Sequence, residues 1–137
     1  MIEFFMPMVP PRATAQERKV THSRGSPVFY DPPKLKDARA KLTAHLSQHR
    51  PEHPYVGPAR LVVKWCFPIS KHTRHEDGDW KITRPDTDNL QKMLKDCMTR
   101  CGFWRDDAQV CSEIVEKFWS ETPGIYVCVD SLAQKEE

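Results

Sequence analysis

Apolar residues recur along this chain at two spacings, one typical of helices and the other of strands. Steps of three or four residues between apolar positions predict a helix over residues 34–49 and a second helix from Leu90 to Met98. The buried face of the first would consist of Leu35, Ala38, Leu42 and Leu46, and that of the second of Leu90, Met93, Leu94, Cys97 and Met98. We expect Asp88 to cap the second helix at its N-terminus and Gly102 to follow its end.

Leu61, Val63, Trp65 and Phe67 would face one side of an extended segment, while Arg60, Val62, Lys64 and Cys66 would face the other. This alternation predicts a half-buried strand over residues 60–67. Apolar segments at residues 2–8, 110–119 and 125–129 predict three further strands. Only a short turn containing Pro123 separates the last two strands, so we expect them to pair as an antiparallel hairpin.

The predicted order is β-α-β-α-β-β, which favours an α+β fold with one mixed sheet and two helices packed on it. Residues 12–33 and 70–85 are polar and broken by prolines and glycines, and we expect both to be loops. A single domain would then span residues 1–137, with residues 131–137 as a frayed tail.

Composition narrows the class of protein. The chain has 137 residues, and none of its apolar runs approaches the ~20 residues of a transmembrane helix. Its N-terminal segment lacks the basic start of a signal peptide, so we expect a soluble, cytoplasmic protein. The five cysteines include no C-x-x-C pair, which argues against a zinc ribbon and favours reduced thiols.

The net charge of +2 hides an uneven distribution along the chain. Residues 12–50 hold nine basic and three acidic side chains, whereas the rest of the chain holds twelve basic and sixteen acidic ones. This division suggests a polyanionic partner held beside a carboxylate site. A solvated helix face would give the same charges, and that alternative stays open at this point.

The segment from Arg84 to Lys92 holds the strongest candidate for a chemical site. One residue separates Asp86 from Asp88, and an extended backbone would point both carboxylates to the same side. Lys92 follows Asp88 by one helical turn. Carboxylates this close need a proton or a cation between them, and Mg²⁺ binds one or two carboxylates while leaving room for phosphate oxygens. Taken alone, the same residues also fit a helix cap and a solvated lysine.

A second acidic pair, Asp106 and Asp107, opens the last-but-one predicted strand and by itself fits a polar turn. The two segments together form a specific pattern: R-P-D-T-D-N-L-Q-K at 84–92, then Asp96, then G-F-W-R-D-D-A-Q-V at 102–110. This pattern resembles the core of the RusA family of Holliday-junction resolvases, which reads D-x-D-N-x-x-K, a helix, and then D-D-x-Q-V.

The resemblance implies a homodimeric, Mg²⁺-dependent endonuclease that cuts four-way DNA junctions by paired, symmetric hydrolysis of phosphodiester bonds. It implies Mn²⁺ as a substitute ion, a role in DNA recombination and repair, and an occurrence on phages and prophages. The family's catalytic residues correspond to Asp86, Asp88, Lys92 and Asp107. The three aspartates would bind the metal, with Asp106 as a secondary ligand candidate.

Basic residues outside the matched catalytic positions are candidates for contacts to DNA phosphates: Arg18, Lys19, Arg24, Lys34 and Arg84. The loop over residues 71–83 is longer than is typical of the family, which bears on substrate preference. Two alternatives stay open: a non-catalytic protein that binds branched DNA, and a less selective nuclease that cuts flaps or forks.

Three further residues, Lys117, Phe103 and Trp104, lie near the motif in sequence. Lys117 has the same strand parity as Asp107, but ten residues of straight strand span about 33 Å, so we expect Lys117 to lie too far away to join the site. We expect Phe103 and Trp104 to pack in the core or in a dimer interface rather than to stack on DNA bases.

Overall fold

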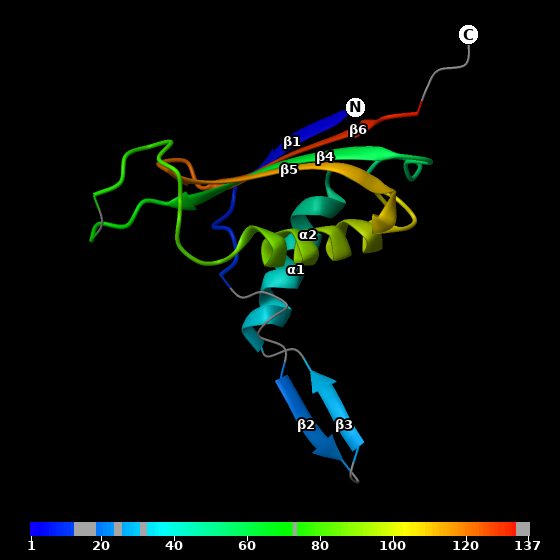
Figure 1. The fold of residues 1–137 in the computed structure, drawn as a ribbon, viewed down its shortest axis with the longest axis horizontal. Coiled ribbons are helices and arrows are strands. Elements are labelled where there is room, and N and C mark those ends of the chain that lie inside the picture. Colours follow the sequence, from blue (N-terminus) through cyan, green and yellow to red (C-terminus); the bar gives the residue numbers. More distant parts are fainter. Residues whose placement is uncertain (13–18, 24–25, 31–32, 73, 134–137) are drawn as a thin grey trace.

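The four strands of the main sheet lie in the order β1-β6-β4-β5, and both helices pack on one face of this sheet (Figure 1). The computed structural model describes residues 1–12, 19–23, 26–30, 33–72 and 74–133. The main elements are β1 (Ile2–Met6), α1 (Pro33–Ser47), β4 (Ala59–Pro68), α2 (Thr87–Arg100), β5 (Val110–Ser120) and β6 (Gly124–Ser131). The predicted α+β class and the β-α-β-α-β-β order of these elements are confirmed.

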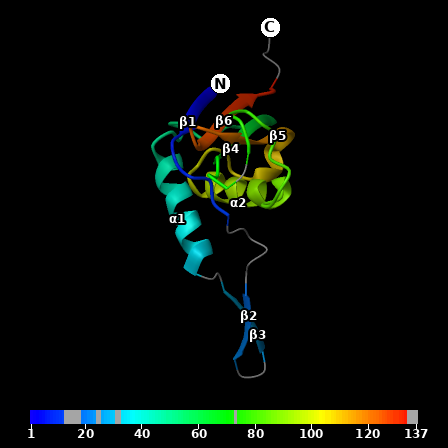
Figure 2. The ribbon, with the colours of Figure 1, turned by 90° about the vertical axis from the view of Figure 1, so that its left-hand side faces the viewer.

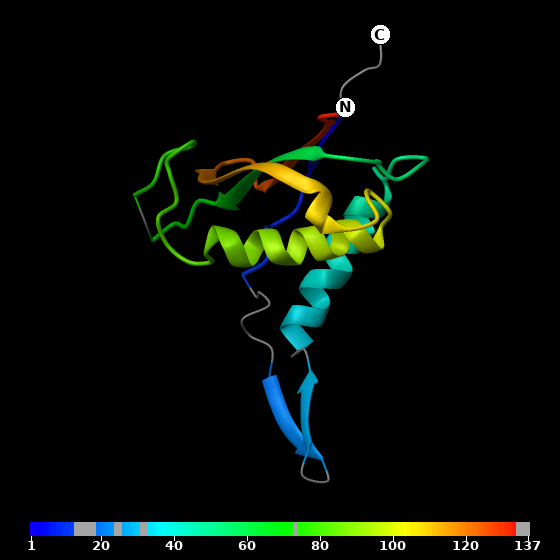
Figure 3. The same cartoon turned by 45° about the vertical axis from the view of Figure 1, so that its right-hand side comes forward.

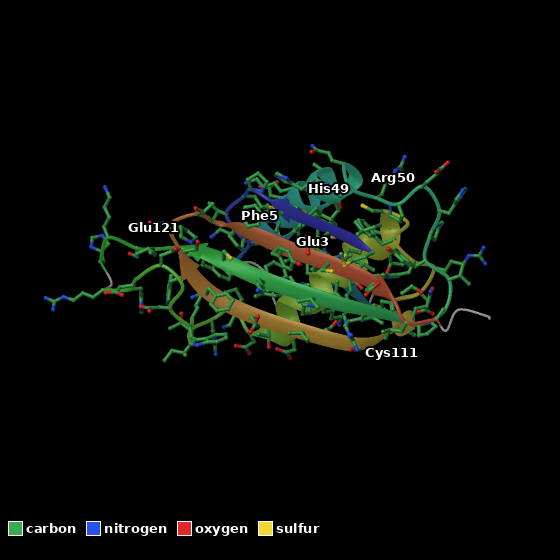
Figure 4. All side chains as sticks on the ribbon, turned by 90° about the horizontal axis from the view of Figure 1, so that it is seen from above. Glu3, Phe5, His49, Arg50, Cys111 and Glu121 are labelled. Atoms are coloured by element: carbon green, nitrogen blue, oxygen red, sulfur yellow. The ribbon has the colours of Figure 1, made fainter. Side chains whose placement is uncertain are left out.

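The predicted hairpin between the last two strands is wrong, because β4 lies between β5 and β6. Figure 4 shows the strands from above in this order. β5 pairs with β4 in parallel, and β6 pairs with β4 in antiparallel orientation. Parallel neighbours need a long crossover connection, and the segment containing α2 supplies it. The turn at Pro123 therefore joins two strands that flank a third.

The segment predicted as a loop over residues 12–33 contains a second, two-stranded sheet. β2 (Lys19–Ser23) and β3 (Ser26–Tyr30) pair as an antiparallel hairpin. This hairpin projects away from the main sheet, beyond the first turn of α1 (Figures 1 and 2). Among the candidate DNA contacts, Lys19 begins β2 and Lys34 lies exposed at the start of α1, whereas Arg18 and Arg24 fall outside the described residues.

The core lies between the sheet and the two helices. Each predicted helix buries the face that the apolar spacing indicated, and β4 alternates between buried and more exposed positions. Phe103 and Trp104 are also buried, which confirms their expected place in the core. Trp65 on β4 donates a hydrogen bond of 2.7 Å from Nε1 to Oε1 of Gln91, which ties α2 to the sheet. None of the described helices has the length and apolarity needed to cross a membrane.

Gly102 ends α2 in the manner that the sequence predicts, and it is a site where stability can be tested. Its φ is +85°, and the N–H of Phe103 donates a hydrogen bond of 3.1 Å to the carbonyl of Met98 in the last turn of the helix. A β-carbon at Gly102 would meet no atom within 4 Å, so only the left-handed backbone opposes a side chain there. We expect Gly102→Ala to lower the free energy of unfolding by about 1–2 kcal/mol in urea denaturation. Gly102→Asn should lower the free energy of unfolding by less, because asparagine tolerates the left-handed backbone. Equal losses for the two variants would contradict this explanation.

Candidate active site

The N-terminus of α2 carries the first two candidate aspartates. Asp86 occupies the N-cap position with φ −74° and ψ 149°, and Asp88 lies in the first turn. The expectation that Asp88 caps the helix is wrong, because the N-cap is Asp86, two residues earlier, and the helix begins at Thr87. The N–H of Leu90 donates to the carbonyl of Asp86 at 3.1 Å. The two carboxylates therefore lie at the positive end of the helix dipole rather than along an extended strand.

The side chains of Asp86, Asp88 and Lys92 are all exposed. Within the described part of the chain, none of the three forms a side-chain hydrogen bond or an ion pair. Lys92 lies one turn beyond Asp88 on the same face of α2. Two unpaired carboxylates are the hard oxygen ligands that Mg²⁺ prefers, and the neighbouring ammonium suits a phosphate oxygen. The donor set at this helix end thus fits a divalent cation that shares a phosphate with Lys92.

Lys117 on β5 anchors the backbone that leads into this helix. Its Nζ donates to the carbonyl oxygens of Thr83 at 2.7 Å and of Pro85 at 2.8 Å, immediately before Asp86. Burial lowers the pKa of Lys117, while the carboxylate of Asp86 acts in the opposite direction. The prediction that Lys117 lies too far from the site is wrong, because the site includes Asp86, which lies near Lys117 and not near Asp107.

Lys81 supports the same segment from a more buried position. Only 8% of this residue is exposed, and its Nζ donates to the hydroxyl of Thr83. The ammonium lies 4.2 Å from the ring centroid of Trp119. Neither lysine was expected from the sequence to support the site. Lys117 lies on the same face of β5 as the inward positions Val115 and Trp119, and a lysine at such a position was the available signal. For Lys81, in a polar loop, there was no such signal.

Asp107 lies at the other end of α2, which runs alongside β5 in the opposite direction (Figure 3). An ion pair of 3.1 Å between Lys95 and Glu113 joins the two elements midway. Asp107 lines a hollow together with Asp96, Thr99, Arg100, Arg105 and Asp106. The helix axis rises about 12 Å from Asp88 to Asp96. Among the described residues, no three or more His, Cys, Asp and Glu side chains come close enough to bind one metal ion. Within one copy of the chain, Asp107 therefore lies too far from Asp86 and Asp88 to share a metal ion with them.

Asp106 and Gln109 form a capping box around the short 3₁₀ helix η2 (Asp107–Gln109). One carboxylate oxygen of Asp106 accepts from the N–H of Ala108 at 2.8 Å, and Oε1 of Gln109 accepts from the N–H of Asp106 at 3.1 Å. Nε2 of Gln109 also donates to the carbonyl of Tyr55 at 2.9 Å. These hydrogen bonds fix the backbone at Asp107. Asp106 therefore has a structural role, in addition to being a secondary candidate for a metal ligand.

Comparison with known proteins identifies the family of this chain. The family model described as Endodeoxyribonuclease RusA matches residues 8–130. The uncharacterized protein YqaN of Bacillus subtilis (strain 168) is 34% identical over 132 residues, which cover 90% of this chain and 87% of YqaN. A crossover junction endodeoxyribonuclease of Lactococcus phage r1t is 31% identical over 110 residues, or 79% of each chain. RusA of Escherichia coli (strain K12) is 56% identical over 34 residues, which cover 25% of this chain and 28% of that protein. The chain therefore belongs to the RusA family of endodeoxyribonucleases.

Proposed function

We propose that this chain resolves four-way DNA junctions by paired, symmetric hydrolysis of phosphodiester bonds, acting as a Mg²⁺-dependent homodimer in which Mn²⁺ can replace Mg²⁺. The observation that carries the proposal is the presence, in a RusA-family chain, of two unpaired carboxylates and a lysine at one exposed helix end: Asp86, Asp88 and Lys92. The names of the relatives from phage r1t and Escherichia coli support a crossover junction as the substrate.

The side chains divide the chemistry among them. Asp86 and Asp88 supply oxygen ligands for the ion, and the dipole of α2 favours an anion beside them. When bound, a divalent ion lowers the pKa of an attacking water and polarises the phosphate. Lys92 binds a phosphate oxygen from one turn further along and stabilises the negative charge that develops in the transition state.

Asp107 enters this proposal from a second copy of the chain. Within one chain it lies beside Asp96 and Arg100, away from Asp86 and Asp88. A twofold axis that sets two α2 helices antiparallel brings Asp107 of one copy toward the aspartates at the N-terminus of α2 in the other. The dimer would then hold two equivalent sites, which suits incision of two opposed strands of a four-way junction.

A panel of DNA substrates tests the proposed function against its two alternatives. The substrates are a four-way junction, a flap, a replication fork and a linear duplex of matched sequence, each with Mg²⁺ at the same ionic strength. We expect a rate of cleavage for the junction at least about tenfold above that for the flap or fork. Equal rates would identify a less selective nuclease, and binding of the junction without cleavage would identify a non-catalytic binding protein.

Lys117 allows a test of how Asp86 is positioned. We expect Lys117→Met to slow junction cleavage by about 10–100-fold, because freeing the carbonyls of Thr83 and Pro85 lets Asp86 move. The variant should also need more Mg²⁺ for half-maximal rate, which a general loss of stability would not require. Lys64→Met is the matched control, since Lys64 is an exposed lysine on the neighbouring strand β4. An unchanged Mg²⁺ dependence in Lys117→Met would remove this positioning role.

A further inference from the structure

Two large apolar side chains are strongly exposed in the loop between β4 and α2. Trp80 is 62% exposed and Ile82 is 91% exposed, and only Lys81 separates them in sequence. The other tryptophans of the chain are all buried: Trp65, Trp104 and Trp119. Isolated apolar side chains on a surface are ordinary, but neighbouring ones beside a candidate site are typical of a surface that a ligand covers.

The loop places both side chains on the face of the sheet that the helices leave open, which is the face seen in Figure 4. Trp80 forms an antiparallel bridge with Phe118 of β5, and Phe118 pairs with Cys66, which alternates with the buried positions of β4. The rings of Trp80 and Phe118 lie in contact, with centroids 4.6 Å apart. The exposure of Trp80 and Ile82 on either side of the buried Lys81 follows the alternation of an extended segment. We call Trp80, Ile82 and Phe118 the Trp80 patch.

Backbone hydrogen bonds hold this loop against β5. The N–H of Gly78 donates to the carbonyl of Trp119 at 2.8 Å, and the N–H of Trp119 donates to the carbonyl of Asp79 at 2.8 Å. The N–H of Lys81 donates to the carbonyl of Lys117 at 3.0 Å. A surface that is already fixed in this way loses little conformational entropy when it binds a ligand.

The Trp80 patch and the candidate active site lie along the same edge of the main sheet. β5 is the edge strand, and the ion pair between Lys95 and Glu113 attaches α2 to it. From Ile82 to Asp86 the backbone spans at most about 14 Å, since four residues of extended chain reach no further. Nucleotides along a DNA strand follow one another at about 3.4 Å of helix rise, so the patch lies within about four nucleotides of a phosphate held at Asp86.

We propose that the Trp80 patch stacks on a base at the branch point of the DNA and thereby favours junctions over uninterrupted duplex. This inference rests on the proposed function, because it takes the cut to lie at Asp86 and Asp88. Stacking of a base on an aromatic ring is favourable for every type of base, and apolar side chains such as that of Ile82 act as wedges between base steps.

The choice of a branch-point base follows from what a duplex leaves accessible. Inside a continuous duplex, neighbouring base pairs cover both faces of each base, and unstacking one costs free energy. At a branch point the stack is already interrupted, so this cost is smaller. Contacts with phosphates exist on any duplex, and they do not supply this preference. A second copy of the chain is the competing occupant of the patch.

Trp80→Ala tests the inference through DNA affinity measured in EDTA, without cleavage. We expect the affinity for a four-way junction to fall by about tenfold and that for a linear duplex of the same sequence to change by less than about twofold. Trp80→Phe should keep most of the junction affinity, because a phenyl ring also stacks. Val56→Ala is the matched control and should change neither affinity, since Val56 is 78% exposed and lies before the start of β4, at the opposite end of that strand.

Abasic nucleotides identify the base that is stacked. Each base around the branch point is removed in turn, and for wild type we expect one position on each cut strand where its removal weakens binding by about tenfold. Trp80→Ala should lose nothing further at that position. Because the other three tryptophans are buried, quenching of the protein's fluorescence by iodide reports mainly on Trp80. The junction should protect Trp80 from iodide more strongly than the duplex does.

Three results would overturn the inference. Equal weakening of junction and duplex binding by Trp80→Ala would show that the patch does not distinguish a branch point. Independent addition of Trp80→Ala and base removal at every position would show that no base stacks on it. Sedimentation of Trp80→Ala as a monomer, where wild type is a dimer, would identify the patch as a subunit contact. Coupling in a protein that does not cut would remove the proposed function and leave the stacking site standing, whereas cutting without any coupled position would do the reverse.

Discussion

Replacing Asp86 or Asp88 by asparagine should abolish cleavage while leaving the affinity for a four-way junction within a few-fold of wild type. Each substitution removes a charged ligand from the proposed metal site, and a loss of several kcal/mol in transition-state stabilisation slows the reaction by about 10³-fold or more. Binding should persist, because contacts of lysine and arginine with phosphates supply most of the affinity. Single-turnover cleavage and gel-shift titration of the same labelled junction measure the two effects separately.

Glu52→Gln is a suitable control for these variants, since Glu52 is an exposed carboxylate beyond the end of α1 and outside the site. It should cleave at the wild-type rate. Cleavage retained by Asp86→Asn and Asp88→Asn would place the chemistry elsewhere. A large loss of junction affinity in either variant would show that these carboxylates act in folding or in DNA binding rather than in catalysis.

Mixing two inactive variants should restore activity if the site is shared between two copies of the chain. Asp86→Asn and Asp107→Asn are each expected to be inactive as homodimers. In a heterodimer of the two, one site would carry both substitutions, and the other would combine an intact Asp86 with an intact Asp107. The mixture should therefore nick one strand of a junction at about a quarter of the wild-type site concentration, because random exchange makes half of the dimers mixed and each has one intact site.

A mixture of Asp86→Asn with Asp88→Asn is the negative control for this test. Those two residues lie on the same helix end, so every heterodimer would carry a damaged aspartate in both sites. This mixture should stay inactive at concentrations where sedimentation shows dimers. Failure of the first mixture under the same conditions would mean that Asp107 does not act from the partner copy.

Local patterns predicted the elements well, and long-range pairing poorly. The spacing of Leu90, Met93 and Leu94 identified α2 and its buried face, because that spacing reflects contacts of the helix itself. The neighbours of β5 were not predictable in the same way. Proximity in sequence suggested β6, but the crossover through α2 places β5 beside β4. That pairing joins residues 52 positions apart, such as Leu61 and Glu113. The β2–β3 hairpin likewise gave too weak an apolar pattern to be expected.

The motif identified the residues of the candidate site but not their arrangement. Asp86, Asp88 and Lys92 share a helix end because three residues of one short segment cannot lie far apart. Asp107 was expected beside them, and the length of α2 instead separates it from them within one chain. Lys117 was excluded by its distance from Asp107 along β5. That distance does not determine which segment packs against the far half of the strand, where Lys117 contacts the backbone of Pro85. Spacing in sequence therefore finds ligands, whereas packing decides which of them meet.

Cleavage of a four-way junction labelled on each strand in turn, with Mg²⁺ and then with EDTA, is the most direct test of the central claim. We expect nicks at symmetry-related positions on two opposed strands, present with Mg²⁺, absent with EDTA and absent from a linear duplex of the same sequence. Nicks that persist in EDTA, or that fall equally on the duplex, would contradict a metal-dependent resolvase.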